Sequence, residues 1–130
     1  MNNQFINPEG IAPPTGYTHV VITDARKTIY ISGQIGIDPQ GKIQEGLRAQ
    51  TIQVFENLKT ALASAGATFD DVVKVTTLIV NYKPEDRILI REIRAQYFNA
   101  QQPPASTLIG VQALALPELL IEIEAIAARD

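Results

Sequence analysis

The chain of 130 residues contains no cysteine and no tryptophan, and its only histidine is His19. The absence of cysteine excludes disulfides, thiolate nucleophiles, iron–sulfur clusters and cysteine-bound zinc. A single histidine also excludes a histidine cluster and the HExxH arrangement that binds catalytic zinc. We therefore expect no metal site.

Long apolar runs and a basic surplus are absent as well. No apolar run approaches the ~20 residues that span a bilayer, and residues 1–10 have neither the basic start nor the apolar stretch of a signal peptide. Eleven lysines and arginines against fourteen acidic residues give a formal net charge of −3, whereas non-specific nucleic-acid binding requires positive charge. We predict a cytoplasmic protein that binds neither membranes nor nucleic acid.

The common catalytic and nucleotide-binding motifs are missing. His19 and Ser32 lie on neighbouring predicted strands, but no GxSxG sequence surrounds any serine, so a Ser-His-Asp triad is disfavoured. Gly33 and Gly36 follow a predicted strand without completing GxGxxG or a P-loop, so no standard phosphate-binding loop is present.

Hydrophobic periodicity predicts one domain, residues 1–130, with an irregular arm at 1–16 that is rich in proline and glycine. The predicted elements are strands at 19–23 and 28–32 forming a hairpin, a helix at 46–65, a strand at 72–80, a helix beginning at Pro84, and strands at 105–111 and 119–127. This order predicts an α/β (α+β) two-layer sandwich, in which two helices cover one face of a mixed sheet of five to six strands. Because the other face also carries apolar residues, we expect a homo-oligomer.

Two charge patterns are candidates for function. Glu122 and Glu124 alternate in a strand and share one face, which predicts either a solvated strand face or a general acid or base in a cleft. Arg87, Arg91 and Arg94 form one stripe of the second helix with no acid three or four residues away. This stripe is either solvated, paired with acids elsewhere in the fold, or a site for an anionic ligand.

Several segments together resemble the RidA/YjgF family from about Tyr17 to the C-terminus. They are Tyr30 to Pro39, Gln50-Thr51, Asn57-Leu58, Ser64 to Ala67, Asp71 to Thr76, Tyr97-Phe98, Pro103 to Ala105, Leu116-Pro117 and Ile121 to Ala127. The resemblance implies a chorismate-mutase-like fold and a homotrimer with a barrel-like core and ligand clefts between subunits. It also implies hydrolysis of reactive enamine or imine metabolites to a 2-keto acid and ammonia, without a metal or organic cofactor.

The resemblance assigns roles to four residues of the cleft. Tyr17 matches the family's cleft tyrosine, and Ser32 and Gly33 match the Ser-Gly pair that lines the pocket. Glu122 matches the glutamate that positions or activates the attacking water. We therefore predict Glu122, Ser32 and Tyr17 as catalytic residues and Gly33 as a substrate-binding residue.

One departure from the family pattern lies in the segment Pro104-Ala105-Ser106-Thr107. Deaminating members have arginine where this chain has Ser106, and that arginine grips the substrate carboxylate through two hydrogen bonds. Serine lacks both the charge and the geometry of a guanidinium. We predict that Ser106 and Thr107 still line the substrate site and that Arg91 supplies the missing guanidinium.

The sequence thus predicts an atypical deaminase-like hydrolase that acts on a small, carboxylate-bearing enamine or imine. The alternative is a non-catalytic trimer that binds a small metabolite in the same clefts. RNA cleavage, sometimes attributed to the family, is disfavoured because the chain is acidic and has no interleaved basic and aromatic stripe.

Overall fold

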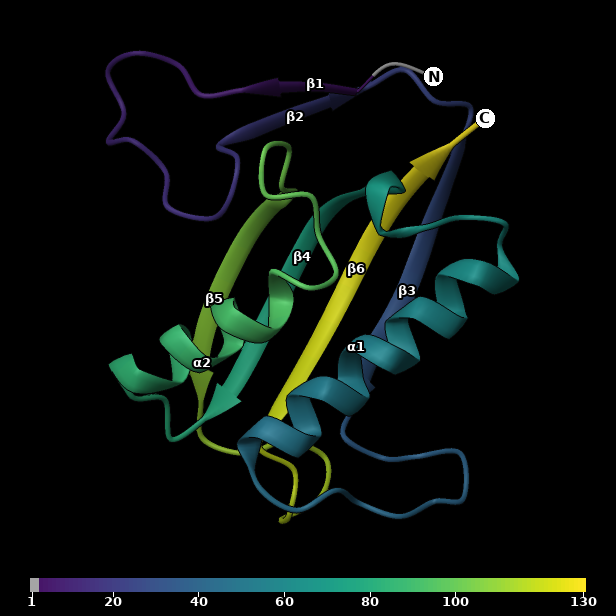
Figure 1. The fold of residues 1–130 in the computed structure, drawn as a ribbon, viewed down its shortest axis with the longest axis vertical. Coiled ribbons are helices and arrows are strands. Elements are labelled where there is room, and N and C mark those ends of the chain that lie inside the picture. The colour runs from purple at the N-terminus through teal and green to yellow at the C-terminus, as the bar shows by residue number, and fades with distance from the viewer. Residues whose placement is uncertain (1–2) are drawn as a thin grey trace.

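Two helices lie on one face of a four-stranded sheet in the computed structural model, which describes residues 3–130 (Figure 1). The helices are α1 (Leu47–Ser64) and α2 (Pro84–Arg94), and the strands, in sheet order, are β3 (Lys27–Ile35), β6 (Ile121–Arg129), β4 (Val72–Val80) and β5 (Ala105–Val111). The sheet is mixed, because β4 is parallel to β5 and β6 is antiparallel to both β4 and β3. This arrangement confirms the predicted α+β class with a mixed sheet and two helices on one face.

The N-terminal segment differs from the prediction. Strand β1 (Asn3–Ile6) lies within the predicted irregular arm and pairs with β2 (Val20–Thr23) in a separate two-stranded sheet. The predicted hairpin of 19–23 with 28–32 is therefore wrong, and the main sheet has four strands rather than five or six. The physical reason is that the prolines begin only at Pro8, so the backbone of 3–6 is free to pair. Residues 7–16 contain no strand or helix, as predicted, and residues 1–2 of the predicted arm lie outside the described residues.

Helix α1 confirms its predicted limits to within one residue. Val54, Phe55, Leu58 and Leu62 recur at helical spacing and are buried against the sheet. The helix ends because Gly66 adopts a φ of 72°, and the N–H groups of residues 66 and 67 then bond to the carbonyls of residues 63 and 62.

Helix α2 begins at Pro84, as predicted, and the Asp86 carboxylate accepts a hydrogen bond from the Lys83 N–H at 2.9 Å. Ile90 and Ile93 are buried beneath the helix. With these positions fixed in the core, the arginines of the same helix turn toward its flank beside β5.

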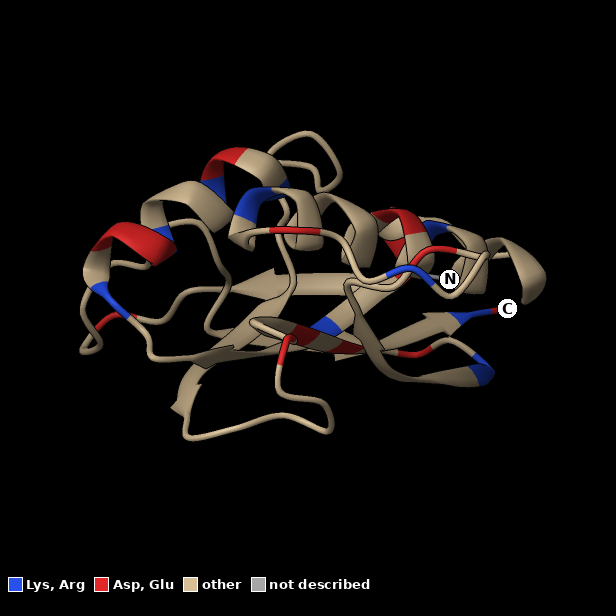
Figure 2. Ribbon diagram, turned by 90° about the horizontal axis from the view of Figure 1, so that it is seen from below, with Lys and Arg blue, Asp and Glu red and all other residues tan. Residues whose placement is uncertain are grey.

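The two faces of the sheet are covered differently. Val75, Ile79 and Ile123 point toward the helices and are buried, and Figure 2 shows both helices in a layer above the strands. The opposite face has no covering layer within the described chain, and Tyr30 there is 78% exposed. The strand predicted to be buried on both faces, 72–80, is buried only on its helix side in one chain.

Neither helix within residues 3–130 is long and apolar enough to cross a membrane.

Candidate functional site

A β-bulge brings Gly33 beneath the Glu122 carboxylate. The pairing of β3 with β6 shifts between Ile31 and Gln34, so that Ser32 and Gly33 together oppose one residue of β6. A Cβ atom built on Gly33 would overlap the Glu122 side chain. The lack of a side chain at Gly33 therefore allows the half-buried Glu122 carboxylate to lie across the bulge.

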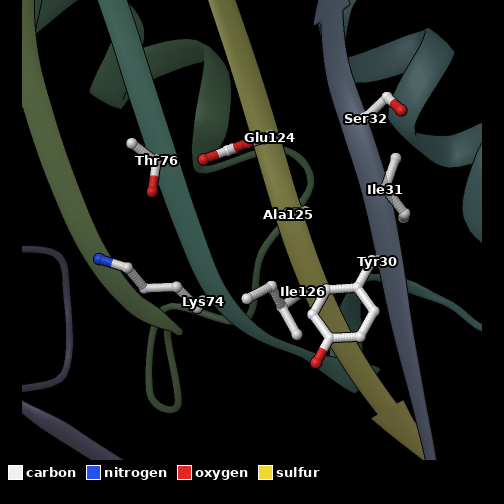
Figure 3. Close-up of a pocket in the computed structure, with 8 residues that line it drawn as sticks. All are labelled: Tyr30, Ile31, Ser32, Lys74, Thr76, Glu124, Ala125 and Ile126. Carbon is white, nitrogen blue, oxygen red and sulfur yellow. The ribbon is translucent and has the colours of Figure 1, made fainter.

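A shallow hollow of about 240 Å³ lies on the open face of the sheet (Figure 3). Its polar lining residues come from three neighbouring strands: Tyr30, Ser32, Lys74, Thr76 and Glu124. Beside this hollow, Lys74 Nζ donates a hydrogen bond of 2.5 Å to Thr107 Oγ1. Ser32 and Thr107 therefore both belong to the open face.

A second cavity, of about 410 Å³, lies on the helix side between α2, β5 and the N-terminal loop. Its lining residues are Thr15, Gly16, Tyr17, Thr77, Arg87, Ile90, Arg91, Arg94, Ser106 and Leu108. We call this cavity the arginine pocket. Successive side chains of β5 point to opposite faces of the sheet. Ser106 and Leu108 point toward the helices, and Thr107 points away from them.

Arg94 is the most constrained cation of the arginine pocket. Its Nη2 donates to the Gly16 carbonyl at 2.6 Å, and its Nη1 donates to Ser106 Oγ at 3.3 Å. The guanidinium also lies 5.6 Å from the centre of the Phe98 ring. Burial lowers the pKa of Arg94 below its usual value, and the charge of Arg91 lowers it further.

The N-terminal loop brings Tyr17 to this pocket. Thr18 fixes the loop through hydrogen bonds to the carbonyls of Pro103, at 2.5 Å, and Pro104, at 3.2 Å. His19 Nε2 lies 2.7 Å from the Ala12 carbonyl, and its ring packs edge-on against Tyr17 at 5.2 Å. His19 therefore supports the loop, which favours the structural interpretation over a triad.

Within one chain the predicted site residues fall into two groups. Tyr17, Arg91 and Ser106 line the arginine pocket. The open face carries Ser32, Gly33, Thr107 and Glu122. Arg94 is not among the predicted site residues, although it lies in the same stripe as Arg91. Its proximity to Ser106 depends on how α2 crosses β5, which helical spacing does not reveal.

Metal ligands do not gather in the described part of the chain. Within residues 3–130, no group of three or more histidine, aspartate or glutamate side chains is arranged to hold a metal ion. The arginine pocket has the chemistry of an anion site instead, because guanidinium groups bind carboxylates through paired hydrogen bonds.

Known proteins are similar to this chain along nearly its whole length. A sequence profile of the family described as endoribonuclease L-PSP matches residues 8–129. Human 2-iminobutanoate/2-iminopropanoate deaminase is 37% identical over 123 residues, which cover 92% of this chain and 82% of the human protein. The crystal structure of YyfB from Yersinia pestis, described as a Rid family protein of unknown function, has a TM-score of 0.89 and 44% identity, covering 98% of this chain and 99% of YyfB. The crystal structure of E. coli TdcF with bound serine has a TM-score of 0.71 and 31% identity, covering 95% and 93%.

Proposed function

This chain belongs to the endoribonuclease L-PSP family, also called RidA/YjgF, and we propose that it hydrolyses a small, carboxylate-bearing imine or enamine. The human relative is named as a deaminase of 2-iminobutanoate and 2-iminopropanoate. The observation that carries the proposal is the position of Arg94, whose guanidinium lies 3.3 Å from Ser106 Oγ. The net charge of −3 gives no support to RNA as the substrate.

The proposed carboxylate site differs from the sequence expectation in its principal residue. The Arg94 guanidinium lies beside β5 at hydrogen-bond distance from Ser106, the position at which the resemblance implies an arginine in deaminating members. Arg91 lines the same cavity, and its side chain packs beside Gly16, whose carbonyl accepts a hydrogen bond from Arg94. We propose that Arg94 binds the carboxylate of the substrate and that Arg91 provides a second positive charge beside it.

We further propose a cytoplasmic homotrimer in which each site draws on two copies of the chain. Two observations support this assembly. Tyr30 and Ile109 leave 78% and 42% of their surfaces exposed on the uncovered side of the sheet. In addition, Ser32 and Glu122 lie on the side opposite the arginine pocket, so contact between copies is needed to bring both groups to one substrate.

The proposed reaction converts an imine and water into a ketone and ammonia. Glu122 accepts a proton as water adds to the imine carbon, and the proton passes to the nitrogen. The hydroxyl proton of this addition product then moves to the nitrogen as the carbon–oxygen double bond forms and the carbon–nitrogen bond breaks, so that ammonia leaves and a 2-keto acid remains. Ser32 and Tyr17 hold the water and substrate, and neither a metal nor an organic cofactor takes part.

The test is the release of 2-oxobutanoate from 2-aminocrotonate, generated in situ by threonine dehydratase. We expect acceleration above the uncatalysed rate, and Glu122→Gln should abolish it. Glu118→Gln is the control, because that exposed side chain lies outside both groups of site residues. Ligand binding without turnover in the wild type would instead support the non-catalytic trimer.

A further inference from the structure

The arginine pocket holds more positive charge than one carboxylate can neutralise. Arg87, Arg91 and Arg94 all line it, and no aspartate or glutamate is among its lining residues. The whole chain has a net charge of −3, so this concentration of cations is local and does not reflect a generally basic surface.

The three guanidinium groups lack acidic partners among residues 3–130. Neither the helix positions three and four residues away nor the ion pairs formed within that range supply one. Two nearby acids are occupied elsewhere: Glu92 pairs with Arg48 at 3.5 Å, and Asp86 binds the Lys83 N–H. Uncompensated like charges at helical spacing are unfavourable, and a bound anion would relieve that repulsion.

The arginines differ in how firmly they are held. Arg94 is half-buried and bonded to Gly16 and Ser106, so two of the five N–H donors of its guanidinium are committed. Arg87 and Arg91 are exposed at the mouth of the pocket. Arg94 therefore offers a fixed contact for one acidic group, about one helical turn or ~5 Å from the next cation.

We infer that the arginine pocket selects a short dianion, namely an imine or enamine that carries a second carboxylate. This inference rests on the proposed function, whose substrate class it narrows. Arg94 binds the carboxylate next to the imine carbon, and Arg91, assisted by Arg87, binds the distal one. Ile90 and Leu108 line the pocket between β5 and α2 and contact the short carbon chain.

The first test measures binding alone, by calorimetry in a low-salt buffer without phosphate. The probes are 2-oxoglutarate and 2-oxopentanoate, which share a carbon skeleton and differ in the second carboxylate. We expect the dianion to bind about tenfold more tightly, as one additional charge-assisted contact provides, and added salt should reduce the preference.

Variants test which arginines cause the preference for the dianion. Arg91→Gln should reduce the ratio of the two affinities to below about threefold. Arg26→Gln, which removes an exposed arginine between β2 and β3 outside the pocket, should preserve it. The inference is overturned by equal affinity for both probes, by no measurable binding of either, or by a ratio unchanged in both Arg91→Gln and Arg87→Gln.

A second arm separates this inference from the proposed activity. An amino acid oxidase, with catalase present, generates 2-iminoglutarate from glutamate or 2-iminobutanoate from 2-aminobutanoate. Preferential binding of the dianion without accelerated hydrolysis of either imine would refute the enzyme and support the dianion site. Hydrolysis of both imines with equal efficiency, together with equal affinity for the two probes, would support the enzyme and overturn the selectivity.

Discussion

Arg94 of α2 donates a hydrogen bond of 3.3 Å to Ser106 of β5, although the two residues lie on different layers of the fold. The same guanidinium binds the Gly16 carbonyl, so a helix, a strand and the N-terminal loop meet at one cation. A cation at this place does not have to originate from β5 itself, because the flank of α2 provides one.

The first prediction concerns Ser106→Arg, which introduces beside Arg94 the arginine that the family resemblance implies at this position. We expect a loss of ~1–3 kcal/mol in the free energy of unfolding, because a fourth guanidinium crowds an occupied position. Urea denaturation measures the change. Adding Arg94→Ala should recover most of the loss, and an unaltered stability in the single variant would show that Arg94 does not occupy this place.

The second prediction concerns Gly33→Ala. The new methyl group overlaps the Glu122 side chain, so the carboxylate must move. The rate of imine hydrolysis should therefore fall sharply. The free energy of unfolding should fall by ~1–3 kcal/mol. The same substitution in a Glu122→Ala background should cost much less stability, because the overlapping atoms are gone. Additive effects in this double-mutant cycle would argue against the contact.

The third prediction concerns the buried Gln50, which is 1% exposed. Its Nε2 donates to the carbonyls of Gln44 and Glu118, and its Oε1 accepts from the Leu120 N–H. Gln50→Ala should cost about 3 kcal/mol in urea denaturation, because buried backbone groups lose their partners and a cavity remains. Gln53→Ala, which removes a single bond within α1, should cost less than about 1 kcal/mol.

The fourth prediction is a delayed titration of Tyr97. Burial, together with the hydrogen bond to Glu56 and the charge of Glu56, raises the pKa of Tyr97 to about 12. Because the folded pKa exceeds the usual value of 10, Tyr97 contributes stability below pH 10 that is lost as the pH rises through about 12.

Absorbance at 295 nm should therefore show a late ionisation step at about pH 12 that belongs to Tyr97. Tyr97→Phe should remove the late step together with the loss of stability between pH 10 and 12. A titration curve without a step near pH 12 would contradict this assignment.

The fifth prediction concerns assembly. Tyr30→Glu places a charge on the uncovered face of the sheet and should convert the proposed trimer to monomers, as measured by sedimentation velocity. Ile88→Glu is the matched control, because Ile88 is similarly exposed, at 67%, on the surface of α2. A wild-type chain that sediments as a monomer would exclude the proposed assembly.

The layer arrangement was predictable because its signals are local. The spacing of Val54, Phe55, Leu58 and Leu62 predicts α1, and Gly66 marks its end. Strand β1 was not predictable in this way, since its pairing with β2 depends on a partner more than a dozen residues later. Strand pairing is decided by such distant partners, which propensity does not identify.

The candidate site was predictable in its residue types but not in its grouping. The alternation of β5 implies that Ser106 and Thr107 face opposite ways, yet nothing local shows which side faces the helices. The stripe of Arg91 and Arg94 was evident, but their order of importance follows from tertiary contacts with Gly16 and Ser106.

The contacts that form the arginine pocket also determine at which stage of folding the chain can bind its ligand. The walls of the pocket are closed by contacts between residues 78 and 85 positions apart, from Arg94 to Gly16 and from Thr18 to Pro103. Forming contacts between residues this far apart in sequence costs loop-closure entropy before the contacts stabilise the fold. A nascent chain therefore cannot recognise its ligand until most of its length has emerged, and bound ligand protects only molecules that have completed folding.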